Sequence, residues 1–194
     1  MREIGAVVRL QIQRSSLKTG EKPHRVYDPS PVLAVRRLAV GGDGVLGEGE
    51  DRSWIVDVHH RAHPQTKNPD GMHGVSVGFT SHYDAMRQRF SDRITLGCAG
   101  ENIIVETSRR FTLEDLAAGL VCVGAGGSEV ARFNVLDVAH PCRAFTGWAL
   151  GNRVESEVLK SHLQFLDGGT RGFYCRGEGS GIVSLGDRLV LVEG

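Results

Sequence analysis

The chain has 194 residues, of which 26 are Gly, and its 23 Lys and Arg balance its 23 Asp and Glu. A net charge of zero argues against the strongly basic surface that a nucleic acid or an anionic membrane would need, so neither partner is expected. With 40% hydrophobic and 24% charged residues the chain is globular rather than disordered, and its length fits a single domain over residues 1–194.

Nothing in the sequence indicates export or membrane insertion. The chain has no run of about 18 apolar residues, and its N-terminus lacks the basic and apolar regions of a secretory signal. Its four cysteines form no C-x-x-C pair, and reduced thiols in the cytoplasm are the expected state. They are Cys98, Cys122, Cys142 and Cys175.

The first half of the chain predicts strands separated by Gly-rich turns. Over Gly5–Arg14 the residues Val8, Leu10 and Ile12 share one face and polar residues share the other, which is typical of a half-buried strand. The pattern then predicts a strand at Val32–Val40, an exposed loop at Gly41–Ser53, a strand at Trp54–His59 and a loop at Pro64–Gly74.

The second half mixes short strands with helices. Helices are predicted at Ser81–Phe90 and Val154–Leu166, and a short one should open at the Thr112–Asp115 capping box and end at Gly119. Strands are predicted at Ile103–Glu106, Leu120–Val123, Ser128–Val138 and in a closing hairpin over Gly181–Val192. Strands and helices do not alternate regularly, so we expect a mainly β barrel or sandwich with two or three short helices.

Cys142 is the main candidate for chemistry. The strand before it should end at Pro141, because proline cannot donate to a strand ladder. Arg143 follows directly, and a neighbouring cation favours the thiolate, which is the nucleophilic and metal-binding form of cysteine. The alternative is a small cysteine that only packs in the interior.

A turn of Gly100, Glu101 and Asn102 precedes the strand at Ile103–Glu106. Glycine permits a close backbone approach, and asparagine offers both a donor and an acceptor. Taken alone, this segment is also what an ordinary turn into a strand looks like.

Four motifs in this order resemble the MOSC family, the molybdenum cofactor sulfurase C-terminal domain. They are the Gly-Glu-Asn turn, an L-x-x-L-x-x-G segment ending at Gly119, the strand that ends in Pro141-Cys142, and the closing Gly181-Ile-Val-Ser-Leu-Gly-Asp187 segment. The stretch from Arg171 to Arg176 is similar to a further family motif, with Arg171 and Gly172 adjacent here. The resemblance implies a β-barrel of the MOSC type.

The resemblance also implies a role for Cys142. In members that bind the molybdenum cofactor (molybdopterin), the cysteine at this position supplies a thiolate to molybdenum, and these members reduce N-hydroxylated small molecules with electrons from separate redox proteins. In others it is proposed to carry sulfur as a persulfide. That use implies a cysteine desulfurase as partner, and pyridoxal phosphate only through that partner. The chain can also be read as a non-catalytic small-molecule binding module.

Three histidines, His59, His60 and His63, fall within five residues. They could form part of a zinc site, but no C-x-x-C or H-E-x-x-H pair accompanies them. We therefore interpret them as hydrogen-bonding residues which, with Arg143 and Arg171, hold the phosphate of a pterin cofactor. Gly100, Glu101 and Asn102 are expected to contact the same cofactor.

Overall fold

The structure is a computed structural model that describes residues 1–90, 92–151 and 155–192. Seven strands close into a barrel, because β1 pairs with β14 at one side and with β9 at the other. Around the barrel the order is β14 (Arg188–Leu191), β10 (Leu120–Val123), β11 (Glu129–Val138), β12 (Phe173–Glu178), β8 (Val75–Phe79), β9 (Ile103–Val105) and β1 (Arg2–Gln13). Only the β8–β9 pair is parallel among these neighbours, and β4 (Val32–Val35) extends the sheet beyond β1.

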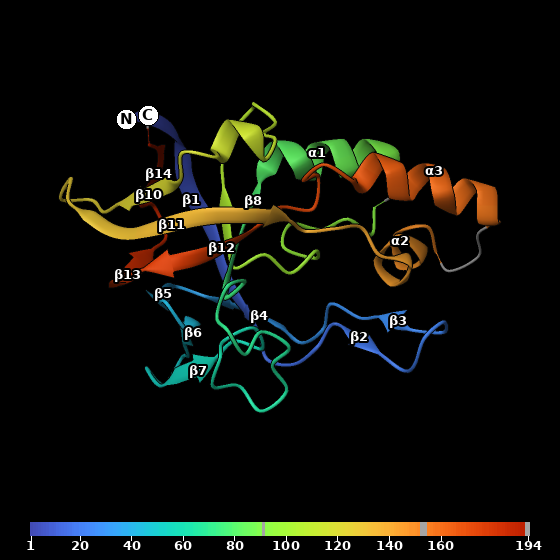
Figure 1. Ribbon diagram of the computed structural model, residues 1–194, viewed down its shortest axis with the longest axis horizontal. Coiled ribbons are helices and arrows are strands. Elements are labelled where there is room, and N and C mark those ends of the chain that lie inside the picture. Colours follow the sequence, from blue (N-terminus) through green and yellow to red (C-terminus); the bar gives the residue numbers. More distant parts are fainter. Residues whose placement is uncertain (91, 152–154, 193–194) are drawn as a thin grey trace.

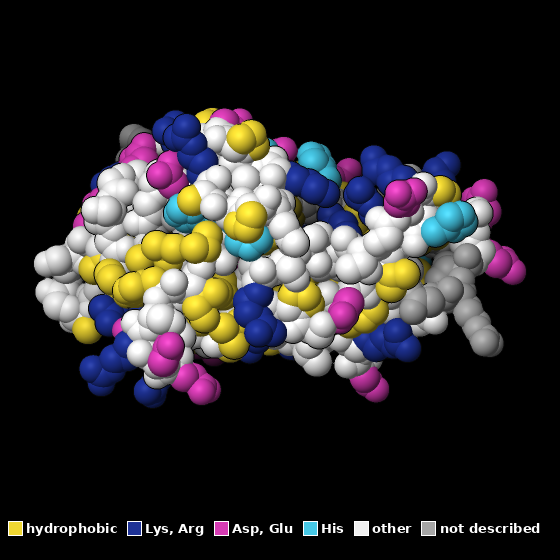
Figure 2. Space-filling view, turned by 90° about the horizontal axis from the view of Figure 1, so that it is seen from below, with side chains coloured by type: hydrophobic (Ala, Val, Ile, Leu, Met, Phe, Trp, Pro, Cys, Tyr) yellow, Lys and Arg dark blue, Asp and Glu magenta, His cyan; other side chains and the backbone are white. Residues whose placement is uncertain are grey.

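A second, four-stranded sheet lies against the barrel (Figure 1). Its order is β13 (Ser180–Ser184), β5 (Arg37–Gly41), β6 (Gly44–Glu48) and β7 (Trp54–Val56). A two-stranded hairpin of β2 (Lys18–Thr19) and β3 (Val26–Tyr27) projects to one side. Figure 2 views the molecule from the side of the second sheet, and positive and negative side chains are interspersed on this face, in agreement with the balanced composition.

Three helices, α1 (Thr80–Arg89), α2 (Arg143–Ala149) and α3 (Ser156–Leu166), gather at the end of the barrel from which the hairpin projects (Figure 1). The single 3₁₀ turn η1 (Glu114–Leu116) lies apart from them, and its Leu116 packs into the core of the barrel. None of the described helices is long and apolar enough to cross a membrane. The helices and the hairpin share a hydrophobic cluster outside the barrel, in which Tyr27 meets Phe145 edge-on with ring centroids 5.1 Å apart.

The prediction of a mainly β barrel with two or three short helices is confirmed. The capping box is also present, since the backbone N–H of Thr112 donates to Asp115 and the Thr112 hydroxyl accepts from the backbone N–H of Asp115. Gly119 follows with φ of 91°, a left-handed conformation that favours glycine.

Several predicted boundaries were wrong. Val32–Val40 is two strands, because the chain leaves β4 at Arg36 and joins the second sheet as β5. The predicted loop at Gly41–Ser53 contains β6, and the predicted strand at Trp54–His59 is regular only over β7. The closing segment is not a hairpin: β13 and β14 pair in different sheets, and Gly186, with φ of 88°, turns the chain between them.

Besides β6, five elements were not predicted, namely β2, β3, β8, β12 and α2. Helix α2 has a glycine at its centre and no side-chain cap, so its stability depends on burying Phe145, Thr146 and Ala149 rather than on local sequence. For the last helix, the predicted start at Val154 lies outside the described residues, and α3 is observed from Ser156.

The buried histidine of α1 predicts a pH dependence of folding stability. His82 is 1% exposed between Phe79 and Phe173, and burial lowers its pKa from the ordinary 6.5 to about 4. Between these two pKa values the unfolded chain therefore binds a proton on His82, whereas His82 stays neutral in the folded chain. The stabilisation is complete above pH 6.5 and is lost as the pH falls toward 4, by about 3 kcal/mol.

The measurement is the free energy of unfolding in urea at several pH values for the wild type and His82→Gln. Burial raises the pKa of Glu101, so the contribution of Glu101 changes with pH in the opposite sense. The difference between the two proteins removes the Glu101 contribution and should shrink between pH 6.5 and 4. A difference that is constant over this range would contradict the prediction.

Candidate functional site

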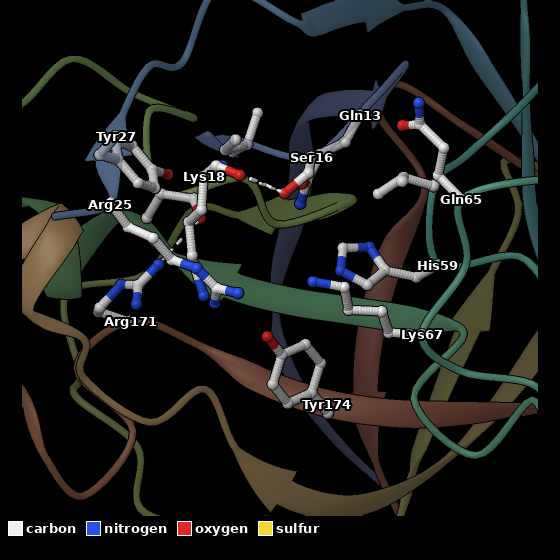
Figure 3. Close-up of a pocket in the computed structure, with 13 residues that line it drawn as sticks. Gln13, Ser16, Lys18, Arg25, Tyr27, His59, Gln65, Lys67, Arg171 and Tyr174 are labelled. Carbon is white, nitrogen blue, oxygen red and sulfur yellow. Dashed lines mark hydrogen bonds between the residues drawn. The ribbon is translucent and has the colours of Figure 1, made fainter. Parts of the chain in front are cut away.

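A pocket of about 220 Å³ opens beside the barrel, under the hairpin. Residues from four separate segments line it, and Figure 3 shows their side chains converging on one space. The lining consists of Gln13, Ser16, Leu17, Lys18, Arg25, Tyr27, Val58, His59, Gln65, Lys67, Ala99, Arg171 and Tyr174. The segments are the end of β1 with the hairpin, the loop after β7, the turn before β9, and the start of β12.

The ionisable side chains that line the pocket are mostly basic. Two lysines, two arginines and a histidine line it, and none of the described lining residues is Asp or Glu. Only four lysines occur in the whole chain, and two of them, Lys18 and Lys67, lie here. A concave site with this lining concentrates positive potential and favours a small anion, even though the chain as a whole is neutral.

Arg171 lies at one end of the pocket and is 6% exposed. Its Nη1 donates to the backbone oxygen of His140 at 3.3 Å, its Nη2 donates to that of Ala99 at 3.4 Å, and the guanidinium lies 4.2 Å from the centre of the Phe145 ring. Burial acts to lower the pKa of Arg171, but the neighbouring Tyr27 and Cys142 groups raise it. The side chain is thus a fixed, protonated cation.

Cys142 contacts this cation directly. The Nη1 atom of Arg171 lies 3.8 Å from the Cys142 Sγ, and the thiol is partly exposed where the chain turns from Pro141 into α2. Arg143, the first residue of α2, is exposed and is not part of the pocket lining. The cation that the structure places beside Cys142 is thus Arg171, which is 29 positions away in the sequence.

His59 lies in the pocket wall and is hydrogen-bonded to the buried carboxylate of Asp57. Asp57 is 0% exposed, and its Oδ1 receives both the backbone N–H of His59, at 2.8 Å, and the ring Nδ1 of His59, at 3.1 Å. The side chain of His59 remains 28% exposed, and in Figure 3 its ring points from one wall toward the centre of the pocket.

The other two histidines of the cluster do not line the pocket, and their rings bond to the backbone of their own loop. The Nδ1 of His60 accepts the backbone N–H of Ala62, and the Nδ1 of His63 accepts that of Gln65, both at 3.1 Å. Both rings thus cap turns of the loop. No group of three or more metal-binding side chains occurs within the described part of the chain, so nothing there favours the zinc alternative.

The Gly-Glu-Asn turn supports the pocket from behind without lining it. Gly100 has φ of 94°, and its carbonyl accepts the side-chain amide of Gln13, a lining residue, at 2.8 Å. Asn102 is buried, and its Nδ2 donates to Asp57 at 3.0 Å. Glu101 is 3% exposed and accepts the hydroxyl of Tyr83 at 2.5 Å, and burial raises the pKa of its carboxyl.

Sequence reasoning named Arg171 and His59 within the lining and missed the other polar residues there. Lys18 lies in the short strand β2, Arg25 in the hairpin turn and Lys67 in the loop after β7, and their local sequences carry no motif. The scarcity of lysine was the one available signal, because an isolated Lys in an Arg-rich chain stands out.

Three comparisons place the chain among known proteins. The MOSC domain family model matches residues 72–190. No curated protein is recognisably similar to the chain in sequence. Among solved structures, the YuaD protein of Bacillus subtilis is 14% identical with a TM-score of 0.57, over 95% of this chain and 93% of that one.

Two further structures share the fold. YiiM of Geobacillus stearothermophilus is 19% identical with a TM-score of 0.53, over 97% of this chain and 75% of that one. YiiM of Escherichia coli is 16% identical with a TM-score of 0.54, over 100% of this chain and 71% of that one. The family match includes β8 to β14, and therefore Cys142, Arg171 and Tyr174. The chain belongs to the MOSC domain family.

Proposed function

We propose that this chain binds the molybdenum cofactor in the basic pocket, with Cys142 as the protein ligand to molybdenum, and reduces N-hydroxylated small molecules. One observation carries the proposal: the thiol of Cys142 lies 3.8 Å from the buried guanidinium of Arg171, which lines a pocket without acidic side chains. A soft thiolate suits a molybdenum–dithiolene centre, and a cationic lining suits the phosphate of a pterin.

The hydrogen-bonding capacity of the pocket supports an anionic occupant. Within the described residues, the Nε atoms of Arg25 and Arg171 are buried and have no hydrogen-bond partner. A buried donor without a partner costs about 1–3 kcal/mol, and an oxygen-rich ligand would remove that cost. Arg25, Arg171 and the two lysines are the residues that would hold the phosphate and the oxygen atoms of the cofactor.

The chain's own residues have three tasks in such a reaction. Arg171 places a fixed positive charge beside the sulfur atom of Cys142. The hairpin carrying Lys18 and Arg25 covers the pocket and restricts access of water. The bound cofactor would supply the two electrons, which a separate redox protein must replace after each turnover.

The test is the metal content of the protein purified from a host that makes the cofactor. The wild type should carry close to one molybdenum per chain, and Cys142→Ala should carry none while unfolding at a similar temperature, because the thiol is partly exposed. Cys142→Ser separates a thiolate ligand from a mere space requirement, since a hydroxyl does not replace a soft ligand. Molybdenum-free wild-type protein would overturn the proposal.

A second candidate, sulfur transfer, is favoured by the exposure of the cysteines. Of the four, Cys142 alone is partly exposed. Burial raises the pKa of Cys98 and of Cys122 to about 12 and that of Cys175 still further. In this function the Cys142 thiolate attacks the terminal sulfur of a desulfurase persulfide and keeps it, and the desulfurase leaves as a thiolate.

Mass spectrometry after incubation with a cysteine desulfurase and cysteine tests this second candidate. The peptide that contains Cys142 should gain the mass of one sulfur atom, and the gain should disappear on reduction. An unmodified Cys142 peptide, together with molybdenum in the isolated protein, would leave the oxidoreductase as the function.

A further inference from the structure

The hydrogen bonds around Asp57 and His59 resemble those of a proton-transfer pair, and neither residue is needed to ligate the metal. We propose that His59 donates the proton that allows the hydroxyl group of the substrate to leave as water. Asp57 acts as its positioning residue. This inference rests on the proposed function, since it assigns a residue to the reduction of an N-hydroxylated substrate.

Asp57 is buried with its acceptor positions occupied by the protein. Its Oδ2 accepts the backbone N–H of Gln13 at 2.7 Å and the Nδ2 of Asn102 at 3.0 Å, and its Oδ1 accepts the backbone N–H of His59 at 2.8 Å. A carboxylate that receives these bonds is an acceptor toward the imidazole as well. The Nδ1 of His59, at 3.1 Å, must therefore carry the hydrogen.

This tautomer leaves Nε2 free to take up and release a proton. The Nδ1–H bond to Asp57 fixes the orientation of the ring, as a carboxylate does in other histidine pairs. Figure 3 shows the ring of His59 directed into the pocket, and its centre lies 6.4 Å from that of the Tyr174 ring. The proton-donating atom thus faces the space that the substrate would enter.

The other donors of the pocket are poorly matched to this task. A general acid works best when its pKa lies near the working pH. Burial raises the pKa of Tyr174 above its ordinary value of 10. Ordinary lysine and arginine side chains lose their protons only well above neutral pH. Histidine is the side chain that most often serves as a general acid, and His59 is the histidine among the described lining residues.

The reaction balances with His59 as one proton source. In the reduction of R–NH–OH the bound cofactor would supply two electrons, and the proton on Nε2 of His59 would go to the departing oxygen, which leaves as water when the N–O bond breaks. A second proton, from solvent, completes the amine R–NH₂. Nε2 of His59 is then reprotonated from solvent, and the redox partner restores the two electrons.

The neighbouring histidines supply an internal reference for the first test. In His60 and His63 the Nδ1 atom accepts a backbone N–H, so their neutral rings must carry the hydrogen on Nε2. Long-range ¹⁵N–¹H spectra of ¹⁵N-histidine-labelled protein at pH 8 should show the Nδ1–H form for His59 and the Nε2–H form for the other two. Asp57→Asn should convert His59 to the Nε2–H form, because an amide can donate to Nδ1. An Nε2–H form of His59 in the wild type would overturn the proposal, whatever the metal content.

The second test measures reduction of a hydroxylamine by protein whose molybdenum content has been determined. His59→Gln should keep its molybdenum and lose about a hundredfold in kcat, the lower end of the usual contribution of a general acid. His24→Gln, an exposed histidine of the hairpin outside the pocket lining, is the matched control and should keep full activity. Unchanged kcat in His59→Gln, or loss of its molybdenum, would overturn the proton-donor role alone. Absence of molybdenum from the wild type would overturn the proposed function and this role together.

Discussion

Arg171→Met should remove molybdenum from the isolated protein. It should also abolish the rise in the unfolding temperature of the protein that small anions cause by binding in the pocket. Arg171 is a buried cation with three hydrogen-bonding contacts and a stacked Phe145 ring, and its Nε has no partner among the described residues. Met keeps most of its length without the charge. Truncating one partner of a buried charge pair costs about 2–5 kcal/mol. Because both Cys142 and an anionic ligand depend on this cation, we expect about 4 kcal/mol, which is roughly a thousandfold loss of affinity.

Inorganic phosphate provides a probe that needs no cofactor. Phosphate should raise the unfolding temperature of the wild type with increasing concentration and leave that of Arg171→Met unchanged, because only a ligand that binds the folded state stabilises it. Arg176→Met is the matched control, since Arg176 is exposed on β12 and lies outside the pocket lining. An equal response to phosphate in Arg171→Met and the wild type would show that Arg171 does not bind the anion.

The barrel could be predicted because short apolar runs between glycines are a local property of the sequence. Which side chains of β1 are buried could not be predicted from the sequence. Gln11 and Gln13 read as the solvent side of a half-buried strand, but they are 0% and 8% exposed. Their side-chain amides donate to the carbonyls of Gly97 and Gly100 across the barrel end. A polar residue satisfied by a distant carbonyl looks the same in sequence as one facing water.

The same limit applies to the candidate site. Cys142, Arg171 and His59 were named from motifs and composition, and the first two are in contact. Lys18 and Arg25 reach the pocket because the hairpin folds over it, and Lys67 because a loop returns from β7, and neither event has a periodic pattern. Arg143 was chosen as the cation beside Cys142 on adjacency, whereas the chain direction at the start of α2 leaves its side chain exposed.

A second large effect is expected at Gly181, where the second sheet crosses the barrel. A Cβ atom on Gly181 would lie 1.6 Å from the carbonyl oxygen of Val130 and 2.9 Å from its carbonyl carbon. Both neighbours are backbone atoms of β11, so no side-chain rotation can relieve the overlap. Gly181→Ala must displace β13 from β11, and we expect a loss of about 4 kcal/mol or more in the free energy of unfolding, the range reserved for severe packing defects.

The consequence should reach the pocket as well as the fold, because the four-stranded sheet supports one of its walls. Strand β13 pairs with β5 at one edge of that sheet. Strand β7 forms the other edge, and the chain continues from it directly into Asp57 and His59. Urea unfolding should therefore show Gly181→Ala strongly destabilised, and phosphate should no longer raise its unfolding temperature. Gly126→Ala is the control, since a Cβ there meets nothing within 4 Å, and its stability should change by less than about 0.5 kcal/mol. If Gly181→Ala is as stable as Gly126→Ala, β13 does not pack closely on β11. In that case the position of the pocket wall that carries His59 does not depend on the contact between these two strands.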